Sequence, residues 1–501
     1  MRKIAIFLVI FWLVAFAAGI TAADFDFSQI KDRVSTFTLK NGLKFILLED
    51  HSVPIARFVT YVNVGGSDER IGIYGISHFL EHLAFKGTEE IGTKDYRAEK
   101  KIMDKMDVVF EKILAEKSKL DPDQQKIKDW EGELEKLKEE ATKYVVSNEI
   151  DTILKREGAV GMNAATSKDF TIYLLSLPSN KIELWAYWES SRFMGPVFRE
   201  FYKEREVIRE ERRVRSENTP IGKLVEELQA LAFKDHPYRV SLVGPMSNIV
   251  NITRRDAREY FRTNYTAGNM VIAVGGDVTP QQLKKLARKY FSKLPAGQRN
   301  PLVYTVEPPQ AGEKNMTMYE ESQPWLTIAY HCPSVRHEDF TRFEVLNYIL
   351  TNGRSSRLYK KMVIQDKTAL NIASMTGFPG SKYPNLYLIF GLPNSGHTTG
   401  ELEKTVMEEI ERLKKEAVSE VELESAKVRA KMVSLETMKS PLYSLANMLG
   451  AEIMLGSWEK AFDELKNIDS VTAQDIRKLA NQYFTGNNRV IARIEKKEVS
   501  K

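Results

Sequence analysis

The residues most able to do chemistry in this chain lie in the stretch Ser77-His78-Phe79-Leu80-Glu81-His82-Leu83. In a helix, residues four apart share a face, so His78 and His82 can present two imidazoles to one metal ion. The predicted metal is one Zn²⁺ per chain, because a catalytic zinc accepts imidazole and carboxylate ligands and keeps an open position for water. Glu81 points to one side of the two histidines, where it can act as general base on the zinc-bound water.

The alternative is that these histidines have only structural roles. A lone histidine on an apolar helix face is usually a satisfied core or surface residue. The chain has only seven histidines in 501 residues, so two of them flanking a glutamate at helical spacing are rare by chance. The pattern therefore favours a metal site.

A third ligand must come from elsewhere, and a helix predicted at 198–217 offers carboxylates. It contains four glutamates near its centre: Glu204, Glu206, Glu210 and Glu211. Glu204 and Glu211 are seven residues apart and share a face, whereas Glu210 points about 120° away from Glu204. The alternative is a solvated helix whose glutamates pair with arginines one turn away. Spacing alone leaves the choice among the four open.

Two further segments can reach such a site. Residues 161–173 run from small residues into β-branched and aromatic ones, which predicts a turn leading into a strand. At a sheet edge, that strand could bind a peptide by backbone pairing. Residues 96 to about 156 have apolar residues at helical spacing among many charges, with Asp121-Pro122 as a predicted N-cap and first turn. This helical hairpin is equally consistent with a lid or docking arm and with a stabilising surface insertion.

The start of the chain predicts export. Residues 1–23 contain Arg2 and Lys3, a long apolar run and small residues near Ala23, as in a cleaved signal peptide. The length of the apolar run leaves an uncleaved N-terminal anchor as the alternative. The single cysteine, Cys332, excludes an internal disulfide. A periplasmic location suits a large exported enzyme without disulfides.

The charge excludes one class of partner. The formal net charge of +5 includes Arg2 and Lys3, which leaves +3 for the mature chain. This is too small over such a length to indicate nucleic-acid binding.

An internal repeat sets the domain organisation. Seven residues of segment 253–273 have counterparts 219 positions later, in segment 472–492: six pairs are identical and the seventh is Tyr265 with Phe484. Each segment predicts an amphipathic helix followed by an apolar strand. An upstream match 266 positions apart places Glu344, Asn347 and Tyr348 opposite His78, Glu81 and His82, so the second copy lacks the metal site. We therefore predict an α+β fold of two tandem homologous domains, 24–297 and 313–501, joined by a linker at 298–312. Each domain should have a mostly antiparallel sheet with helices packed on one face.

The same motifs resemble the pitrilysin-type inverzincin metallopeptidases, and among them the two-domain subunits of the mitochondrial processing peptidase and its bacterial relatives. The matching segments are HFLEHLAFKGT at 78–88, Asn163-Ala164-x-Thr166 to Tyr173, EREVIREE at 204–211 and His236-Pro237-Tyr238. The resemblance implies that Glu211 is the third zinc ligand and that Glu204 orients the site from behind the ligands. It also implies that substrate pairs with the edge strand at Asn163 and Ala164.

One departure from the family concerns the second domain. Active relatives hold the substrate carbonyl with an Arg and a Tyr seven positions apart, but this chain has Val363 and Leu370 at the matching positions. The resemblance implies a dimer, and the departure suggests a heterodimer in which a related subunit supplies the missing pair. The alternative is a homodimer that uses other donors, such as Arg354 or Tyr359.

Together these observations predict a secreted zinc metalloendopeptidase that hydrolyses unfolded peptides, with Glu81 as base and Glu204 as a supporting catalytic residue. The competing hypothesis is a catalytically silent structural or peptide-binding subunit of the same fold. Such a subunit would have little reason to retain the full set of His78, Glu81, His82, Glu204 and Glu211.

Overall fold

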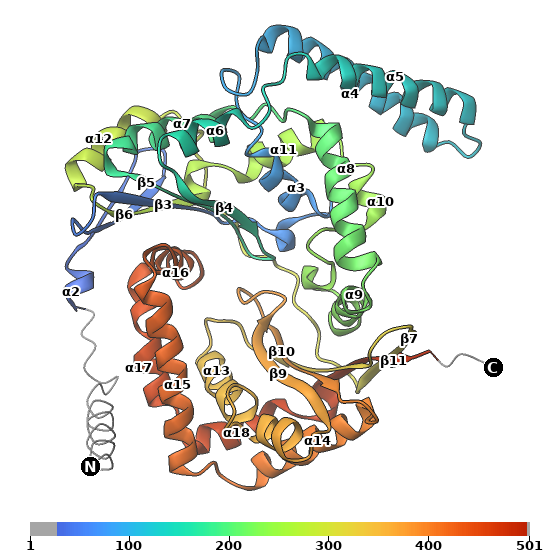
Figure 1. Ribbon diagram of the computed structural model, residues 1–501, viewed down its shortest axis with the longest axis vertical. Coiled ribbons are helices and arrows are strands. Elements are labelled where there is room, and N and C mark those ends of the chain that lie inside the picture. Colours follow the sequence, from blue (N-terminus) through green and yellow to red (C-terminus); the bar gives the residue numbers. More distant parts are fainter. Residues whose placement is uncertain (1–27, 498–501) are drawn as a thin grey trace, which may run out of the picture.

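A computed structural model describes residues 28–497 (Figure 1). The predicted signal peptide at 1–23 lies outside the described residues. Across 28–497, every helix is too short or too polar to cross a lipid bilayer. The two-domain α+β prediction is confirmed, since each half of the chain builds its own mixed sheet.

The first half forms a six-stranded sheet in the order β1-β2-β6-β3-β5-β4. Its strands are β1 (Val34–Thr38), β2 (Lys44–Glu49), β3 (Ile55–Val62), β4 (Val160–Thr166), β5 (Thr171–Pro178) and β6 (Met270–Gly276). Only the β2–β6 pairing is parallel. The turn predicted at the small residues after Gly161 is wrong, because these residues belong to the edge strand β4. The predicted strand that follows is β5.

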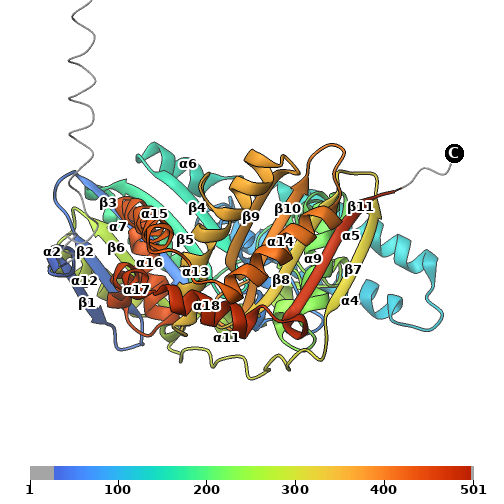
Figure 2. The ribbon, with the colours of Figure 1, turned by 90° about the horizontal axis from the view of Figure 1, so that it is seen from below.

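The second half repeats this topology with one strand fewer, in the order β7-β11-β8-β10-β9. Its strands are β7 (Lys314–Glu320), β8 (Trp325–Cys332), β9 (Ala369–Phe378), β10 (Asn385–Pro393) and β11 (Arg489–Lys496). The parallel β7–β11 pair matches β2–β6, and β9 occupies the edge that β4 occupies in the first half. Figure 2 shows both edge strands, β4 and β9, toward the same side of the molecule.

Helices cover one face of each sheet. The helices of the first half are α2 (Ser28–Lys31), α3 (Ile76–Leu83), α4 (Tyr96–Lys117), α5 (Gln124–Thr142), α6 (Glu149–Arg156), α7 (Ile182–Met194), α8 (Phe201–Arg212), α9 (Pro220–Ala232), α10 (Met246–Ile249), α11 (Arg254–Asn264) and α12 (Pro280–Phe291). Those of the second half are α13 (Asp339–Leu350), α14 (Thr399–Lys415), α15 (Glu420–Lys439), α16 (Pro441–Met454), α17 (Glu464–Ser470) and α18 (Ala473–Tyr483). The strand β6 is buried at every position. Its side chains alternate between the core under the helices, with Ile272, and a second apolar cluster on the other face, with Ala273.

The predicted repeat has the same local structure in both copies. The helices α11 and α18 begin with equivalent capping boxes, Thr253 with Asp256 and Thr472 with Asp475. Each helix leads into an interior strand of its sheet, β6 or β11. The 219-residue spacing also relates Phe201, the first residue of α8, to Glu420, the first residue of α15.

The opposite face of each sheet is covered by a helix from the other half. From the second half, α16 packs Leu445 and Met448 against the first sheet at Val59. From the first half, α9 packs Leu224 and Leu228 against the second sheet, on a surface that includes the β11 strand. Figure 1 shows α16 and α9 between the two sheets. The halves are therefore interlocked, because each supplies part of the other's core.

The segment at 96–156 forms the predicted hairpin, α4 and α5, followed by a short helix, α6. The predicted N-cap at Asp121 is wrong: Asp123 is the N-cap of α5, and its side chain accepts hydrogen bonds from the backbone N–H groups of Gln125 and Lys126. Both views show the hairpin projecting outward, away from β4 (Figures 1 and 2). The hairpin therefore does not form a lid over that edge.

Candidate metal centre

The helix α3 carries the two histidines, and its start is fixed by a buried carboxylate. Glu69 accepts hydrogen bonds from the backbone N–H groups of Gly75 (2.7 Å) and Ser77 (2.8 Å). Gly75 has a φ of 94°, and a Cβ there would lie 2.1 Å from the carbonyl oxygen of Val243. Because both the cap and the turn are constrained, the axis of α3 and the directions of its side chains are set from its first turn.

The two histidines and Glu211 converge on one point. The Nε2 atoms of His78 and His82 lie 3.5 Å from Oε1 and Oε2 of Glu211, respectively. Candidate ligand atoms of the three residues lie within 4.8 Å of one another, and no other metal-binding group of this kind occurs in residues 28–497. Two ligands at about 2.1 Å from a tetrahedral zinc ion lie roughly 3.4 Å apart, so this donor set fits one zinc ion.

Burial keeps one of the histidines ready to bind a metal. Burial, together with the nearby positive charge of His82, lowers the pKa of His78 to about 3. The neutral imidazole is the form that binds a metal. The Nδ1 atom of His78 is buried and has no hydrogen-bond partner in the described residues.

Glu81 lies beside these three residues but outside the group of ligands. Its Oε2 atom accepts a hydrogen bond from the Thr166 hydroxyl at 2.6 Å, and Thr166 is the last residue of the edge strand β4. Burial raises the pKa of Glu81, although the Thr166 hydrogen bond opposes that shift. The carboxylate is therefore positioned by the same strand that could bind a peptide.

Glu204 supports His82 from behind. Its Oε1 atom lies 2.9 Å from Nδ1 of His82, and its Oε2 atom lies 2.6 Å from Nζ of Lys86. Burial alone would raise the pKa of Glu204, but the hydrogen bonds from His82 and Lys86 outweigh it and lower the pKa to about 2. A carboxylate on Nδ1 leaves Nε2 as the metal-binding nitrogen.

The other two glutamates of α8 face away from the histidines. Glu206 pairs with Arg209, and Glu210 pairs with Arg213, in both cases one turn along the helix. Of the four candidates, only Glu204 and Glu211 lie against His82. The shared face predicted from their seven-residue spacing is thus the face that meets α3.

The edge strand β4 borders an open hollow beside the candidate ligands. The hollow has a volume of about 330 Å³, and its walls include Glu81, His82, Asn163 and Ala164. β4 pairs with β5 on one side only, so its other side is free of backbone partners in the described chain. Asn148, which precedes α6, also lines the hollow, so the 96–156 segment contributes to it.

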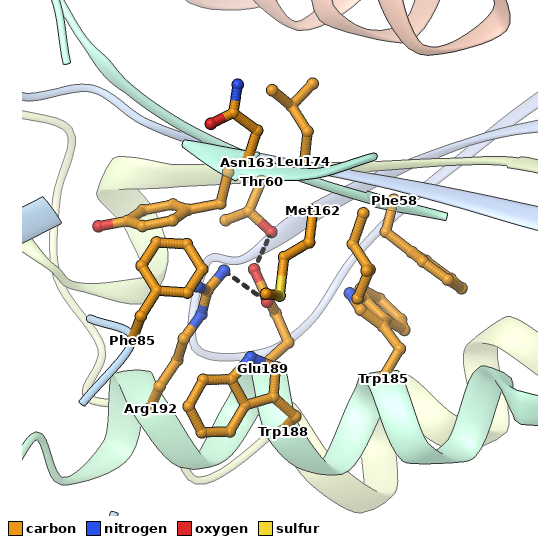
Figure 3. A pocket seen from close by; sticks show the side chains of 12 residues that line it. Phe58, Thr60, Phe85, Met162, Asn163, Leu174, Trp185, Trp188, Glu189 and Arg192 are labelled. Atoms are coloured by element: carbon orange, nitrogen blue, oxygen red, sulfur yellow. Dashed lines mark hydrogen bonds and ion pairs between the residues drawn. The ribbon is translucent and has the colours of Figure 1, made fainter. Parts of the chain in front are cut away.

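A closely packed layer supports β4 from beneath. Figure 3 shows Met162 pointing into this layer and Asn163 pointing away from it. Within the layer, Glu189 accepts hydrogen bonds from Thr60 and from Arg192, whose guanidinium lies 4.1 Å from the centre of the Tyr173 ring. This buried ion pair and the surrounding aromatic rings hold the strand in place.

Arg199 joins the elements that carry the ligands. Its guanidinium donates to both oxygens of Glu99 on α4 and to the carbonyl oxygens of Lys86, Thr88 and Ile91, just after α3. The side chains of Arg199 and Glu99 are each only 1% exposed. Arg199 also lies directly before α8, so one residue ties together α3, α4 and α8.

Sequence reasoning missed Glu69, Lys86 and Arg199. Arg199 acts on residues about 100 positions away, so no local spacing pointed to it. Glu69 caps residues only six and eight positions ahead, but it lies outside the motif of α3. Lys86 follows His82 by four residues, and this helical spacing is the one signal that could have been noticed.

Val363 and Leu370, the residues that match the Arg and Tyr pair of the family, lie in the second half of the chain. Val363 lies in a short helical segment at Tyr359–Gln365, and Leu370 lies on the edge strand β9 with 50% of its surface exposed. Arg354 and Tyr359 lie between α13 and β9, on the second half of the chain.

Comparison with known families agrees with this geometry. The model for the insulinase family, peptidase family M16, matches residues 44–121, and the model for the peptidase M16 inactive domain matches residues 251–429. The chain therefore belongs to the peptidase M16 family, which confirms the resemblance seen in the sequence.

Its relatives include named zinc proteases. The zinc protease PqqE of Helicobacter pylori is 26% identical over 455 residues, which cover 89% of each chain. The mitochondrial-processing peptidase subunit beta of Lentinula edodes is 23% identical and covers 89% of this chain and 86% of its own.

Solved structures share the fold. A protease from Helicobacter pylori superposes with a TM-score of 0.76 at 24% identity, covering 92% of this chain and 99% of its own. The periplasmic protease PqqL of Escherichia coli gives a TM-score of 0.68 at 15% identity, with 93% of this chain matched to 48% of that protein.

Proposed function

We propose that this chain is a zinc-dependent endopeptidase that hydrolyses unfolded peptides, with His78, His82 and Glu211 as the zinc ligands. The observation that carries the proposal is the convergence of two imidazoles and one carboxylate within 4.8 Å, beside a separate carboxylate, Glu81. The names of its zinc-protease relatives support the same metal.

A zinc ion held by these three residues would act as a Lewis acid, polarising the substrate carbonyl and lowering the pKa of a bound water. Glu81 would accept the proton of the attacking water and later deliver a proton to the leaving amine. The hydroxyl of Thr166 would hold the Glu81 carboxylate in place through its 2.6 Å hydrogen bond. Glu204 would keep Nε2 of His82 directed at the metal through its contact with Nδ1.

The substrate would lie along β4 in an extended conformation. Asn163 and Ala164 would pair their backbone groups with the peptide, because β4 is an unpaired edge within reach of Glu81. Backbone pairing requires an extended chain, and therefore favours unfolded peptides over folded proteins.

The quaternary state and location belong to the same proposal. A relative named as a subunit, mitochondrial-processing peptidase subunit beta, supports a paired arrangement. A heterodimer would allow a related subunit to supply the Arg and Tyr that Val363 and Leu370 replace. The periplasmic location in the name of PqqL supports an exported enzyme, in line with the sequence of residues 1–23. The domain division at 298–312 is likewise proposed.

A silent subunit is the second candidate, because the inactive-domain model matches residues 251–429. That match lies outside His78, Glu81, His82, Glu204 and Glu211, all of which are retained in one site. The zinc peptidase is therefore the stronger proposal.

The test is metal removal followed by restoration. The protein stripped by a chelator should lose cleavage of an unstructured peptide mixture, and one equivalent of Zn²⁺ should restore it while Mg²⁺ should not. The matched variant Glu211→Gln should fail to recover with one equivalent of Zn²⁺, whereas Glu210→Gln should recover fully because Glu210 faces Arg213. Cleavage that survives complete metal removal would refute the proposal.

A further inference from the structure

A large cavity lies between the halves, on the face of the first sheet that meets α16. Its volume is about 600 Å³, which is within the range of small-molecule sites. Its walls come from the first sheet and from α13, α15, α16 and α17. The metal centre does not use this space, since none of its residues lines the cavity.

The cavity occupies the place in the second half that the metal centre occupies in the first. The spacing of 266 relates α3 to α13, and the spacing of 219 relates α8 to α15. The metal-centre residues His78, Glu81, His82 and Glu211 thus have as counterparts Glu344, Asn347, Tyr348 and Ala430. All four counterparts line the cavity. In the second half, Ala430 stands in place of the third ligand, and Glu344 and Tyr348 stand in place of the two histidines. The metal site is therefore absent there, and a hollow remains.

Two polar groups that line this hollow have no partner. Glu344 makes no hydrogen bond or ion pair with any described residue, although its carboxylate lines the cavity. Tyr61, which is 2% exposed, also lines the cavity, and its buried hydroxyl lacks a hydrogen-bond partner in the described residues. Buried polar groups are usually paired, so the Tyr61 hydroxyl is unusual. The Glu344 side chain is partly exposed, so its unpaired carboxylate is open to a ligand in the cavity.

The charges around Glu344 are unbalanced. Glu464 on α17 faces the same cavity, and its carboxylate accepts a hydrogen bond from Ser434 at 2.9 Å. Lys460 also lines the cavity, but its Nζ donates to the carbonyl oxygen of Leu455 at 2.9 Å. Arg429 donates to the backbone carbonyl oxygens of Asn352 and Tyr348 rather than to either carboxylate.

This imbalance changes the protonation of the acid pair. Burial, reinforced by the charge of Glu464, raises the pKa of Glu344 to about 8. Burial also raises the pKa of Glu464. A cation beside the two carboxylates would favour their ionised forms and lower both pKa values again.

We propose that the cavity is a binding site for a primary ammonium group carried on an apolar chain. The ammonium group would donate hydrogen bonds to the carboxylates of Glu344 and Glu464. The apolar chain would lie against the walls formed by Phe170, Ile172 and other apolar residues of the cavity. An ammonium group has three N–H donors and no acceptor, so it can bond to both carboxylates at once.

The same ammonium chemistry occurs in a free alkylamine and in a lysine side chain of a peptide. The probes are therefore n-hexylammonium and an N-acetylated peptide with one lysine, each against a neutral match, n-hexanol and the peptide with acetylated lysine. Calorimetric titration of the full mature chain should give one site for n-hexylammonium and much weaker binding of n-hexanol. Lysine-dependent peptide binding identifies the source as a peptide, and its absence identifies a free amine.

The variants test the residues. Glu344→Gln is close in shape to the protonated side chain, so it should fold, and it should raise the dissociation constant for n-hexylammonium at least tenfold. The control Glu436→Gln, on the exposed side of α15, should leave binding unchanged.

Proton linkage gives a readout that a structural role would not produce. Binding should tighten from pH 6.5 to 9, because the ammonium group binds the ionised form of Glu344. At pH 7, binding of n-hexylammonium should release a proton. Calorimetric titration in two buffers of different ionisation enthalpy measures this release. Equal binding of n-hexanol, unchanged binding in Glu344→Gln, or no saturable binding of n-hexylammonium would overturn the proposal.

Discussion

At the scale of single residues, the metal centre depends on side chains that bind no metal. Glu204 contacts His82 and Lys86, and Glu69 caps the helix that carries both histidines. Thr166 holds the base, Glu81. The ligands are therefore oriented by partners from other segments of the chain.

Loss of the Glu204 carboxylate should weaken metal binding without unfolding the protein. In Glu204→Gln, the amide is a poorer acceptor for Nδ1 of His82, so zinc affinity should fall by about 10–100-fold. Competition with a chromophoric chelator measures this affinity. The control Glu206→Gln, whose side chain pairs with Arg209, should bind zinc as the wild type does. Equal zinc affinities for Glu204→Gln and the wild type would contradict this role.

Glu344 should make stability fall as the pH rises. Its pKa is about 8 in the folded protein and near 4.5 when unfolded, so the folded state holds the extra proton. The resulting stabilisation is full below about pH 4.5 and is lost as the pH rises through 8. Urea unfolding from pH 5 to 9 should show a smaller loss of unfolding free energy for Glu344→Gln than for the wild type. Parallel curves for the two proteins would contradict the raised pKa.

At the scale of elements, Arg199 links the two helices that carry the ligands to the inserted helix α4. Its buried pairing with Glu99 explains why the insert is more than a surface addition, even though the hairpin tip points outward. The insert holds the loop after α3 and contributes Asn148 to the open hollow.

Breaking this buried pair on one side should be costly. Arg199→Ala leaves Glu99 charged and unpaired, which should lower the free energy of unfolding by about 3–5 kcal/mol. The exposed pair Lys100 and Asp104 on the same helix is a matched control, and Lys100→Ala should cost less than about 1 kcal/mol. Denaturant unfolding measures both. Similar losses for the two variants would show that Arg199 does not link these elements.

Local sequence patterns predicted the helices and strands better than the tertiary contacts between them. The pattern around His78 and the shared face of Glu204 and Glu211 followed from helical periodicity. The repeat followed from matching residues 219 positions apart. The N-cap of α5 was misplaced by two residues because both Asp121 and Asp123 suit that position. The contacts of Arg199 depend on tertiary packing between distant segments, which no single segment encodes.

At the scale of the whole molecule, the two halves exchange helices. The sequence predicted α+β halves with helices on one face, but an amphipathic helix does not reveal which sheet it will cover. The structure adds α9 on the second sheet and α16 on the first. Asp169 joins the halves further, accepting hydrogen bonds from the backbone N–H groups of Ser381 and Lys382.

Cutting the linker should not separate the halves. Tyr304 is 86% exposed, so a specific protease site introduced between Thr305 and Val306 should be accessible. After cleavage the two fragments should elute together in size-exclusion chromatography, because each retains a helix packed on the other's sheet. A second variant with Leu445→Ala on α16 should weaken that association, since it removes buried apolar contact with the first sheet. Separation of the fragments without denaturant would contradict the exchanged packing.

The most direct test of the central claim compares wild type with Glu81→Gln for zinc content and peptide cleavage. Glu81 lies outside the metal ligands, so both proteins should contain one zinc ion per chain. Assayed together with the partner subunit, only the wild type should cleave an unstructured peptide mixture, because the amide of the variant cannot accept the proton of the attacking water. Undiminished cleavage by the zinc-loaded variant, or absence of zinc from both proteins, would contradict the account.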